Sequence, residues 1–142
     1  RARVSYEGQA AIELEALATP VPLGAAPRYP VEQAWAGGQV VLDPSPLVRG
    51  LLEAGPGPIA AAAFHESLGA ATVEAVAALA GRRDLGVIVL TGGVFQNHRL
   101  TRIVRAGLVS AGLEVLVHRR VPPNDGGISV GQSAVAAHLP LT

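Results

Sequence analysis

The stretch VLTGGVFQNHRL, residues 89–100, decides how the second half of this 142-residue chain is interpreted. An apolar run ends there at Gly92 and Gly93, Asn97 follows, and an amphipathic segment with several arginines begins. This order of residues predicts a strand, a tight turn and a helix. The same pattern fits a backbone that is open toward a ligand, because glycine has no Cβ and permits close approach.

The sequence after this corner continues as helix, strand and helix. Apolar positions in residues 98–111 recur at helical spacing, the run LEVLVH at 113–118 is typical of a strand, and a last helical pattern follows the loop at 122–127. This alternation predicts an α/β fold with a parallel βαβ unit. Ligands of such sheets bind beyond the carboxyl ends of the strands, so the corners at 92–97 and 122–127 are expected to lie together at one edge.

The first half of the chain is predicted to be mainly helical. Helical patterns occupy residues 6–18, 44–55 and 58–80, and short strands are predicted at 29–33 and 37–43. The continuous apolar run GVIVL at 86–90 predicts a strand that is buried on both faces. Arg99, Arg102 and Arg105 are expected to form a solvated face of the helix that follows it.

The composition limits the classes of function. The length corresponds to one ordinary domain, and a net charge of zero without a basic stripe argues against nucleic-acid binding. The absence of Cys excludes disulfides, thiolate metal ligands and a cysteine nucleophile in these residues. No apolar run has membrane-spanning length and no signal-peptide pattern is present, so we expect a cytoplasmic protein without a membrane partner. The absence of Met and the abrupt start suggest a piece of a longer protein.

Two readings stay open for the residues of each corner. Gly92 and Gly93 fit either a tight turn or the close approach of a phosphate, to which unpaired N–H groups of the next helix would add partial positive charge. Asn97 is either the N-cap of that helix or a donor and acceptor for ribose or phosphate. Asp125 is either the cap of the last helix or a cation ligand beside a nucleotide.

Structural roles are predicted for most of the remaining polar residues. His65, His98, His118 and His138 lie on separate segments without metal-ligand spacing, so we expect them to pack or to lie at the surface. His98 is the exception among them that keeps a possible site role, because it follows Asn97 at the expected edge. Arg99 has a second interpretation as a phosphate ligand.

Four stretches taken together resemble a known family. They are VSYEGQAAIELEALA (4–18), AAAFHESL (61–68), VLTGGVFQNHRL (89–100) and VPPNDGGISVGQSAVAAH (121–138). In this order they resemble the C-terminal part of HypF-type carbamoyltransferases, the maturation proteins of NiFe hydrogenases. The resemblance covers nearly the whole chain. It implies that residues 1–142 are the C-terminal lobe of a Kae1-like domain, one lobe of an actin/Hsp70-like (ASKHA) fold, within a larger protein.

The resemblance also implies an activity. In the family, a YrdC-like domain makes carbamoyl-adenylate from carbamoyl phosphate and ATP. The Kae1-like domain then passes the carbamoyl group to the C-terminal cysteine of the partner protein HypE. The cofactors implied for this chain are therefore ATP or carbamoyl-adenylate and a divalent metal. The nucleophile is the thiolate of the partner and not a residue of this chain.

Individual residues take their implied roles from the family pattern. The pattern GGV-x2-N contacts the nucleotide in the Kae1/TsaD group, which assigns nucleotide contacts to Gly92, Gly93 and Asn97. A C-terminal Asp of the group ligates the active-site metal, and its counterpart is Asp125. The YEGQAA segment stands where the group has a nucleotide-facing helix start, which adds Glu7 and Gly8.

One departure from the family pattern limits these expectations. The metal site also needs two histidines from an HHxAH-type motif upstream, and no such motif occurs in this sequence. We therefore expect the chain alone to be inactive, with an incomplete metal site. Two alternatives remain: a threonylcarbamoyl transferase of the Kae1/TsaD type that modifies tRNA, and a non-catalytic lobe that associates with proteins, for example as a homodimer.

Overall fold

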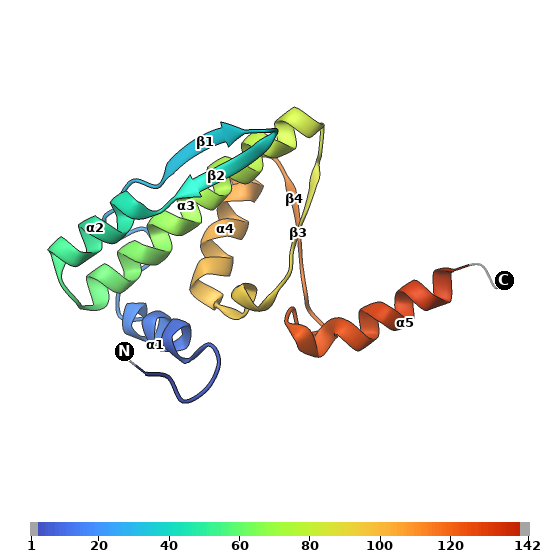
Figure 1. Cartoon of the computed structure of the whole chain (residues 1–142), viewed down its shortest axis with the longest axis horizontal. Helices are drawn as coiled ribbons and strands as arrows, with labels where there is room; N and C mark the ends of the chain where they lie inside the picture. Colours follow the sequence, from blue (N-terminus) through green and yellow to red (C-terminus); the bar gives the residue numbers. More distant parts are fainter. Residues whose placement is uncertain (1–2, 140–142) are drawn as a thin grey trace.

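The computed structural model of the chain describes residues 3–139 as helices joined to two short β-sheets (Figure 1). The elements are α1 (Gln9–Ala18), β1 (Glu32–Ala36), β2 (Gln39–Asp43), α2 (Ser45–Ala54), α3 (Pro58–Arg83), β3 (Val87–Leu90), α4 (His98–Ser110), β4 (Glu114–Val117) and α5 (Ile128–His138). Two short 3-10 turns, η1 (Gly93–Gln96) and η2 (Asp125–Gly127), precede α4 and α5. Each predicted helix and strand is present, with bounds that differ by a few residues.

The strands β1 and β2 form an antiparallel hairpin that lies along α3 (Figure 1). Its turn consists of Gly37 and Gly38, whose φ angles of 57° and 79° suit the tight turns that join twisted strands. The guanidinium of Arg82, from the last turn of α3, lies 3.6 Å from the centre of the Trp35 ring. The hairpin is therefore fastened to the end of α3 by a cation–π contact.

The strands β3 and β4 are parallel and are connected through α4, which confirms the predicted βαβ unit. The stripe of α4 packs Leu100, Val104 and Leu108 toward this sheet, and all three are buried. The prediction that β3 is buried on both faces is wrong. Val87 and Val89 are 49% and 58% exposed, because α4 covers only one face of the sheet in residues 3–139.

The helices α3 and α4 interlock through two glycines. A Cβ on Gly69 of α3 would lie 2.5 Å from Ile103 Cγ2, and a Cβ on Gly107 of α4 would lie 2.6 Å from Val73 Cγ2. Each helix thus supplies a glycine that receives a β-branched side chain of the other. This close approach explains the small-residue pattern of residues 58–80, whose buried apolar members are alanines.

The last helix, α5, stands apart from the rest of the molecule (Figure 1). All of its residues are exposed, among them Val130 and Val135 at 51% and 62%. None of the helices within residues 3–139 is long and apolar enough to cross a membrane.

Candidate functional site at the edge of the parallel sheet

The two predicted corners meet at the carboxyl edge of β3 and β4. The backbone N–H of Gly92 donates to the carbonyl of Pro123 over 2.8 Å. A Cβ built on Gly93 would lie 3.8 Å from the Cβ of Asn124, in ordinary contact. The prediction that both corners share one edge of the sheet is confirmed, and any ligand at this edge would face both of them.

The two glycines of the first corner differ in their backbone. Gly92 has φ 97°, in the left-handed region that L side chains avoid, so glycine is needed there for conformation alone. Gly93 has no positive φ, and the chain itself leaves room for a Cβ at this position. A requirement for glycine at position 93 would therefore come from something outside the chain.

Asn97 is the N-cap of α4, as one of the two readings predicted. Its Oδ1 accepts a hydrogen bond from the N–H of Leu100 over 2.8 Å. Its Nδ2 lies 3.0 Å from Nε2 of His65, which is 1% exposed on α3. The carboxamide is thereby tied to two helices and still has one amide hydrogen and one oxygen lone pair without a partner in these contacts.

The amides at the start of α4 are less free than the sequence pattern indicated. Asn97 accepts the N–H of Leu100, and Oε1 of Glu15 on α1 accepts the N–H of Arg99 over 2.9 Å. The prediction of unpaired amides is wrong at these two positions, because side-chain oxygens of the chain already accept their hydrogen bonds. The carboxylate of Glu15 also complements the positive end of the helix dipole.

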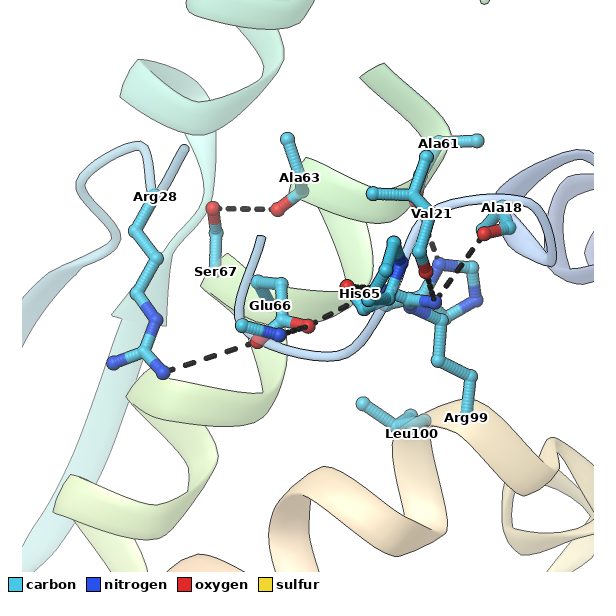
Figure 2. Close-up of polar contacts among 12 residues, drawn as sticks. Ala18, Val21, Arg28, Ala61, Ala63, His65, Glu66, Ser67, Arg99 and Leu100 are labelled. Atoms are coloured by element: carbon cyan, nitrogen blue, oxygen red, sulfur yellow. Dashed lines mark hydrogen bonds and ion pairs between the residues drawn. The ribbon is translucent and has the colours of Figure 1, made fainter. Parts of the chain in front are cut away.

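Arg99 is buried, which corrects both predictions made for it. It is 9% exposed and donates from Nη1 to the carbonyls of Val21 and Ala18 over 2.7 and 3.2 Å (Figure 2). Its Nη2 lies 3.2 Å from Oε1 of Glu66, which is 2% exposed on α3. Arg99 therefore belongs neither to the solvated face nor to a phosphate site, but joins α4 to the loop after α1.

Glu66 is a structural residue that sequence reasoning did not assign. Besides Arg99, its Oε1 accepts the N–H of Gly24 over 2.9 Å, and Arg28 lies 3.8 Å from its Oε2 (Figure 2). A glutamate within a helical pattern of small, mostly apolar residues was the available signal, because a buried carboxylate requires a cation or several donors.

Asp125 lies in η2 with an exposed side chain and does not cap the last helix. Asn124 caps η2, with its Oδ1 accepting the N–H of Gly126 over 3.2 Å, and the N-cap position of α5 is Gly127, which offers no side-chain cap. Among the described residues, no group of three His, Cys, Asp or Glu side chains is placed to hold a metal ion. Asp125 could supply one carboxylate ligand, but the residues present do not form a complete metal site.

Glu7 and Gly8 lie at the start of α1, where both are exposed and Gly8 has φ 79°. Within residues 3–139, no hydrogen bond joins either residue to the corners at 92–97 and 122–127. Their sequence-based role therefore stays a prediction.

The other histidines have separate surroundings. His118 Nε2 lies 2.9 Å from the hydroxyl of Thr91, so this pair joins the ends of β4 and β3. His138 Nδ1 lies 2.8 Å from the carbonyl of Ala134 in its own helix, and His98 is exposed. These placements agree with the packing and surface roles that were predicted.

The sequence of the chain matches one protein family. Residues 1–132 match the model described as carbamoyltransferase, Kae1-like domain, second subdomain. The carbamoyltransferase HypF of Rhodobacter capsulatus is 41% identical over 136 residues, which cover 95% of this chain and 17% of that protein. A carbamoyltransferase HypF homolog of Cupriavidus necator is 38% identical, over 97% of this chain and 36% of that protein.

Solved structures give the same result for the fold. The crystal structure of a full-length HypF in its phosphate- and nucleotide-bound form superposes with a TM-score of 0.84 at 32% identity, over 96% of this chain and 18% of that one. HypF of T. kodakarensis gives 0.77 at 27% identity. The mixed α/β fold is that of a Kae1-like domain and is consistent with the ASKHA-type lobe expected from the sequence. The chain spans about a fifth of these structures, and it belongs to the HypF carbamoyltransferase family.

Proposed function

We propose that this chain forms the nucleotide-facing edge of a carbamoyltransferase. The reaction would pass a carbamoyl group from carbamoyl-adenylate, made from carbamoyl phosphate and ATP, to the C-terminal cysteine of a HypE-type protein. The observation that carries the proposal is the meeting of the two corners, where the Gly92 amide binds the Pro123 carbonyl over 2.8 Å. Support also comes from a family member whose crystal structure is described as phosphate- and nucleotide-bound.

The corner offers two kinds of group to a nucleotide. The adenylate phosphate would lie over the Gly92–Gly93 turn, where no atom of residues 3–139 beyond the adjacent residues comes within 4 Å of a Cβ on Gly92. Asn97 would hydrogen-bond through its remaining amide hydrogen and oxygen lone pair. Because Glu15 and Asn97 already fill two amides of α4, the phosphate would not bind at the first turn of this helix. The proposed role of the chain is thus to bind and orient the nucleotide.

The chemical step would take place between two bound molecules. The partner's thiolate attacks the carbamoyl carbon, a C–S bond forms, and the C–O bond to the adenylate phosphate breaks, so that AMP leaves with its electron pair. The present chain contains no Cys that could replace this nucleophile. Its corner would fix the phosphate so that the carbamoyl carbon stays open to the thiolate.

Asp125 is proposed as one metal ligand, with the other ligands supplied from outside this chain. Since the described residues do not complete such a site, no step of the reaction is derived through a metal. Glu7 and Gly8 are proposed as further nucleotide-facing residues. Since the nucleotide clamp and the metal site both need another lobe, we propose that the 142-residue chain alone does not transfer carbamoyl groups.

The test is a chimera. The part of this chain that aligns with the Rhodobacter capsulatus HypF, 41% identical over 136 residues, replaces the matched segment of that protein, and carbamoylation of a HypE-type acceptor is followed by mass spectrometry. The proposal expects transfer by the chimera and none by the chain alone. A folded chimera that makes carbamoyl-adenylate but transfers no carbamoyl group would contradict the proposal. Carbamoyl transfer by the isolated chain would contradict the proposal that this chain alone is inactive. The matched relatives are HypF proteins, which favours a protein thiol over tRNA as the acceptor.

A second candidate function, protein association, is favoured by an apolar hollow between α1, α2 and α3. The hollow has a volume of about 420 Å³ and is lined by side chains that include Leu14, Leu17, Val48, Leu52 and Phe64. Leu52 is 78% exposed beside it. If this surface joins two copies, sedimentation velocity gives a dimer that Leu52→Glu converts to a monomer. A monomer at all concentrations would reject the homodimer.

A further inference from the structure

His65 lies between the backbone of its own helix and the proposed ligand residue Asn97. Its Nδ1 lies 2.7 Å from the carbonyl of Ala61, one turn earlier in α3, and its Nε2 lies 3.0 Å from Nδ2 of Asn97. The His65 side chain, labelled in Figure 2, is 1% exposed, and its ring makes a T-shaped contact with the Phe64 ring at 5.5 Å between centroids. The ring is therefore held on both nitrogens and at its edge.

The chemistry of these contacts fixes the protons. A carbonyl can only accept, so Nδ1 of His65 must carry the hydrogen that is donated to Ala61. In the neutral ring Nε2 then has a lone pair, and the group of Asn97 that faces it must be the donating NH₂. The carboxamide oxygen is left to accept the N–H of Leu100, as observed at 2.8 Å. One carbonyl of α3 thus sets the orientation of the Asn97 amide.

We propose that His65 is a positioning residue for the nucleotide, acting through Asn97. This inference rests on the proposed function, because it assigns His65 the task of fixing which groups Asn97 presents. With the amide turned as observed, the ligand meets one N–H donor and one oxygen acceptor in fixed places. Such a pair suits ribose hydroxyls, each of which donates and accepts.

A purely structural role is the competing explanation. A buried histidine that bonds the carbonyl four residues earlier stabilises its helix whether or not a ligand exists. His138 provides the matched control, because its Nδ1 lies 2.8 Å from the carbonyl of Ala134, also four residues earlier, on exposed α5. The two histidines share this contact with their own helix, and only His65 adds the link to Asn97.

The experiment uses the 142-residue chain and three variants. His65→Phe keeps a ring and removes both nitrogens, His65→Gln keeps a polar group that can face Asn97, and His138→Phe is the control. Without ligand, NMR measures the side-chain NH₂ signals of Asn97 and the hydrogen exchange of the Leu100 amide. AMP is then titrated at millimolar concentrations, and thermal unfolding identifies any variant that does not fold.

A positioning role predicts changes at Asn97 that stability alone does not explain. His65→Phe should move the Asn97 NH₂ signals, speed the exchange of the Leu100 amide and weaken AMP binding by about tenfold. His65→Gln should recover part of this loss, and His138→Phe should change none of the three. In an Asn97→Ala background, His65→Phe should cause no further loss of affinity, because the effect passes through Asn97.

Other results would overturn the inference. Unchanged Asn97 signals in a folded His65→Phe chain would remove the link on which it rests. Additive losses of affinity in the double variant would show that His65 acts independently of Asn97. If the wild-type chain binds no AMP while its Asn97 signals depend on His65, control of Asn97 by His65 is upheld, and carbamoyl transfer by the chimera that His65→Phe leaves unchanged would refute the positioning role for the nucleotide.

Discussion

The amide of Gly92 and the carbonyl of Pro123 are joined by a 2.8 Å hydrogen bond across the ends of β3 and β4. Thirty-one positions separate the two residues in the sequence, so this bond fixes one corner of the molecule against the other. It places the Gly92–Gly93 turn beside the loop that carries Asn124, and the proposed nucleotide site depends on it.

Gly93→Val should weaken nucleotide binding with little effect on folding. Gly93 has no positive φ, and within residues 3–139 a Cβ there meets Asn124 at 3.8 Å, so the backbone and its neighbours accept a β-carbon at this position. A phosphate over the turn would be displaced, and AMP affinity measured by NMR should fall by about tenfold or more, equivalent to roughly 1.4 kcal/mol. Retained affinity in a folded variant would mean that the turn is only structural.

Gly92→Val is the contrasting change, and its effect should be on stability. Gly92 has φ 97°, where a β-branched residue is strained by about 1–3 kcal/mol. Urea unfolding should therefore give a lower free energy of unfolding for Gly92→Val than for Gly93→Val. Equal stability of the two variants would contradict the described backbone of this turn.

Arg99→Met should destabilise the chain strongly. The substitution leaves Glu66, which is 2% exposed, without its buried cation, and breaking a buried pair in this way costs about 3–5 kcal/mol. Arg102→Met on the exposed side of the same helix is the control, and a change within about 0.5 kcal/mol is expected there. Comparable losses for both variants in urea unfolding would show that Arg99 is not the structural residue described.

Asn97→Asp should separate the capping role from the proposed binding role. A carboxylate can still accept the N–H of Leu100 and is favourable at a helix N-terminus, so the cap is retained. It has no amide hydrogen for His65 or for a nucleotide. Asn97→Asp should have a higher melting temperature than Asn97→Ala, because the alanine variant loses about 1 kcal/mol of capping energy. Both variants should lose AMP affinity, and normal binding by Asn97→Asp would exclude amide donation to the ligand.

In the chimera with the Rhodobacter capsulatus relative, Asp125→Ala should lower carbamoyl transfer without changing stability or carbamoyl-adenylate formation. The side chain is exposed and caps nothing, so thermal unfolding should be unchanged. Carbamoyl transfer to the acceptor should fall while carbamoyl-adenylate formation continues. Equal loss of both steps would count against Asp125 as a ligand in the transfer site. Asn124→Ala, which removes the cap of η2, is the control for damage to the corner itself.

The βαβ unit and its shared corner were predictable because both depend on local patterns. The stripe of Leu100, Val104 and Leu108 specifies α4, and parallel strands joined by one helix must end on the same side. The N-cap at Asn97 follows from residue preference at a single position. Tertiary contacts were not needed for any of these predictions.

The environment of Arg99 could not be predicted in this way. Its acceptors at Val21 and Ala18 are 78 and 81 positions away, and helical periodicity only places it beside the apolar stripe. The prediction that both faces of β3 are buried was wrong for a related reason. An apolar run indicates which side chains avoid water, but it does not identify the segment that covers them.

The interlocked glycines of α3 and α4 have a consequence for the site at the sheet edge. Gly69 lies one helical turn beyond His65, and its partner Ile103 lies on the helix that Asn97 begins. A single methyl group added at position 69 would wedge the two helices apart and lengthen the His65–Asn97 link before it disturbed any strand. Affinity at the proposed site would then respond to volume changes in the packed seam between α3 and α4.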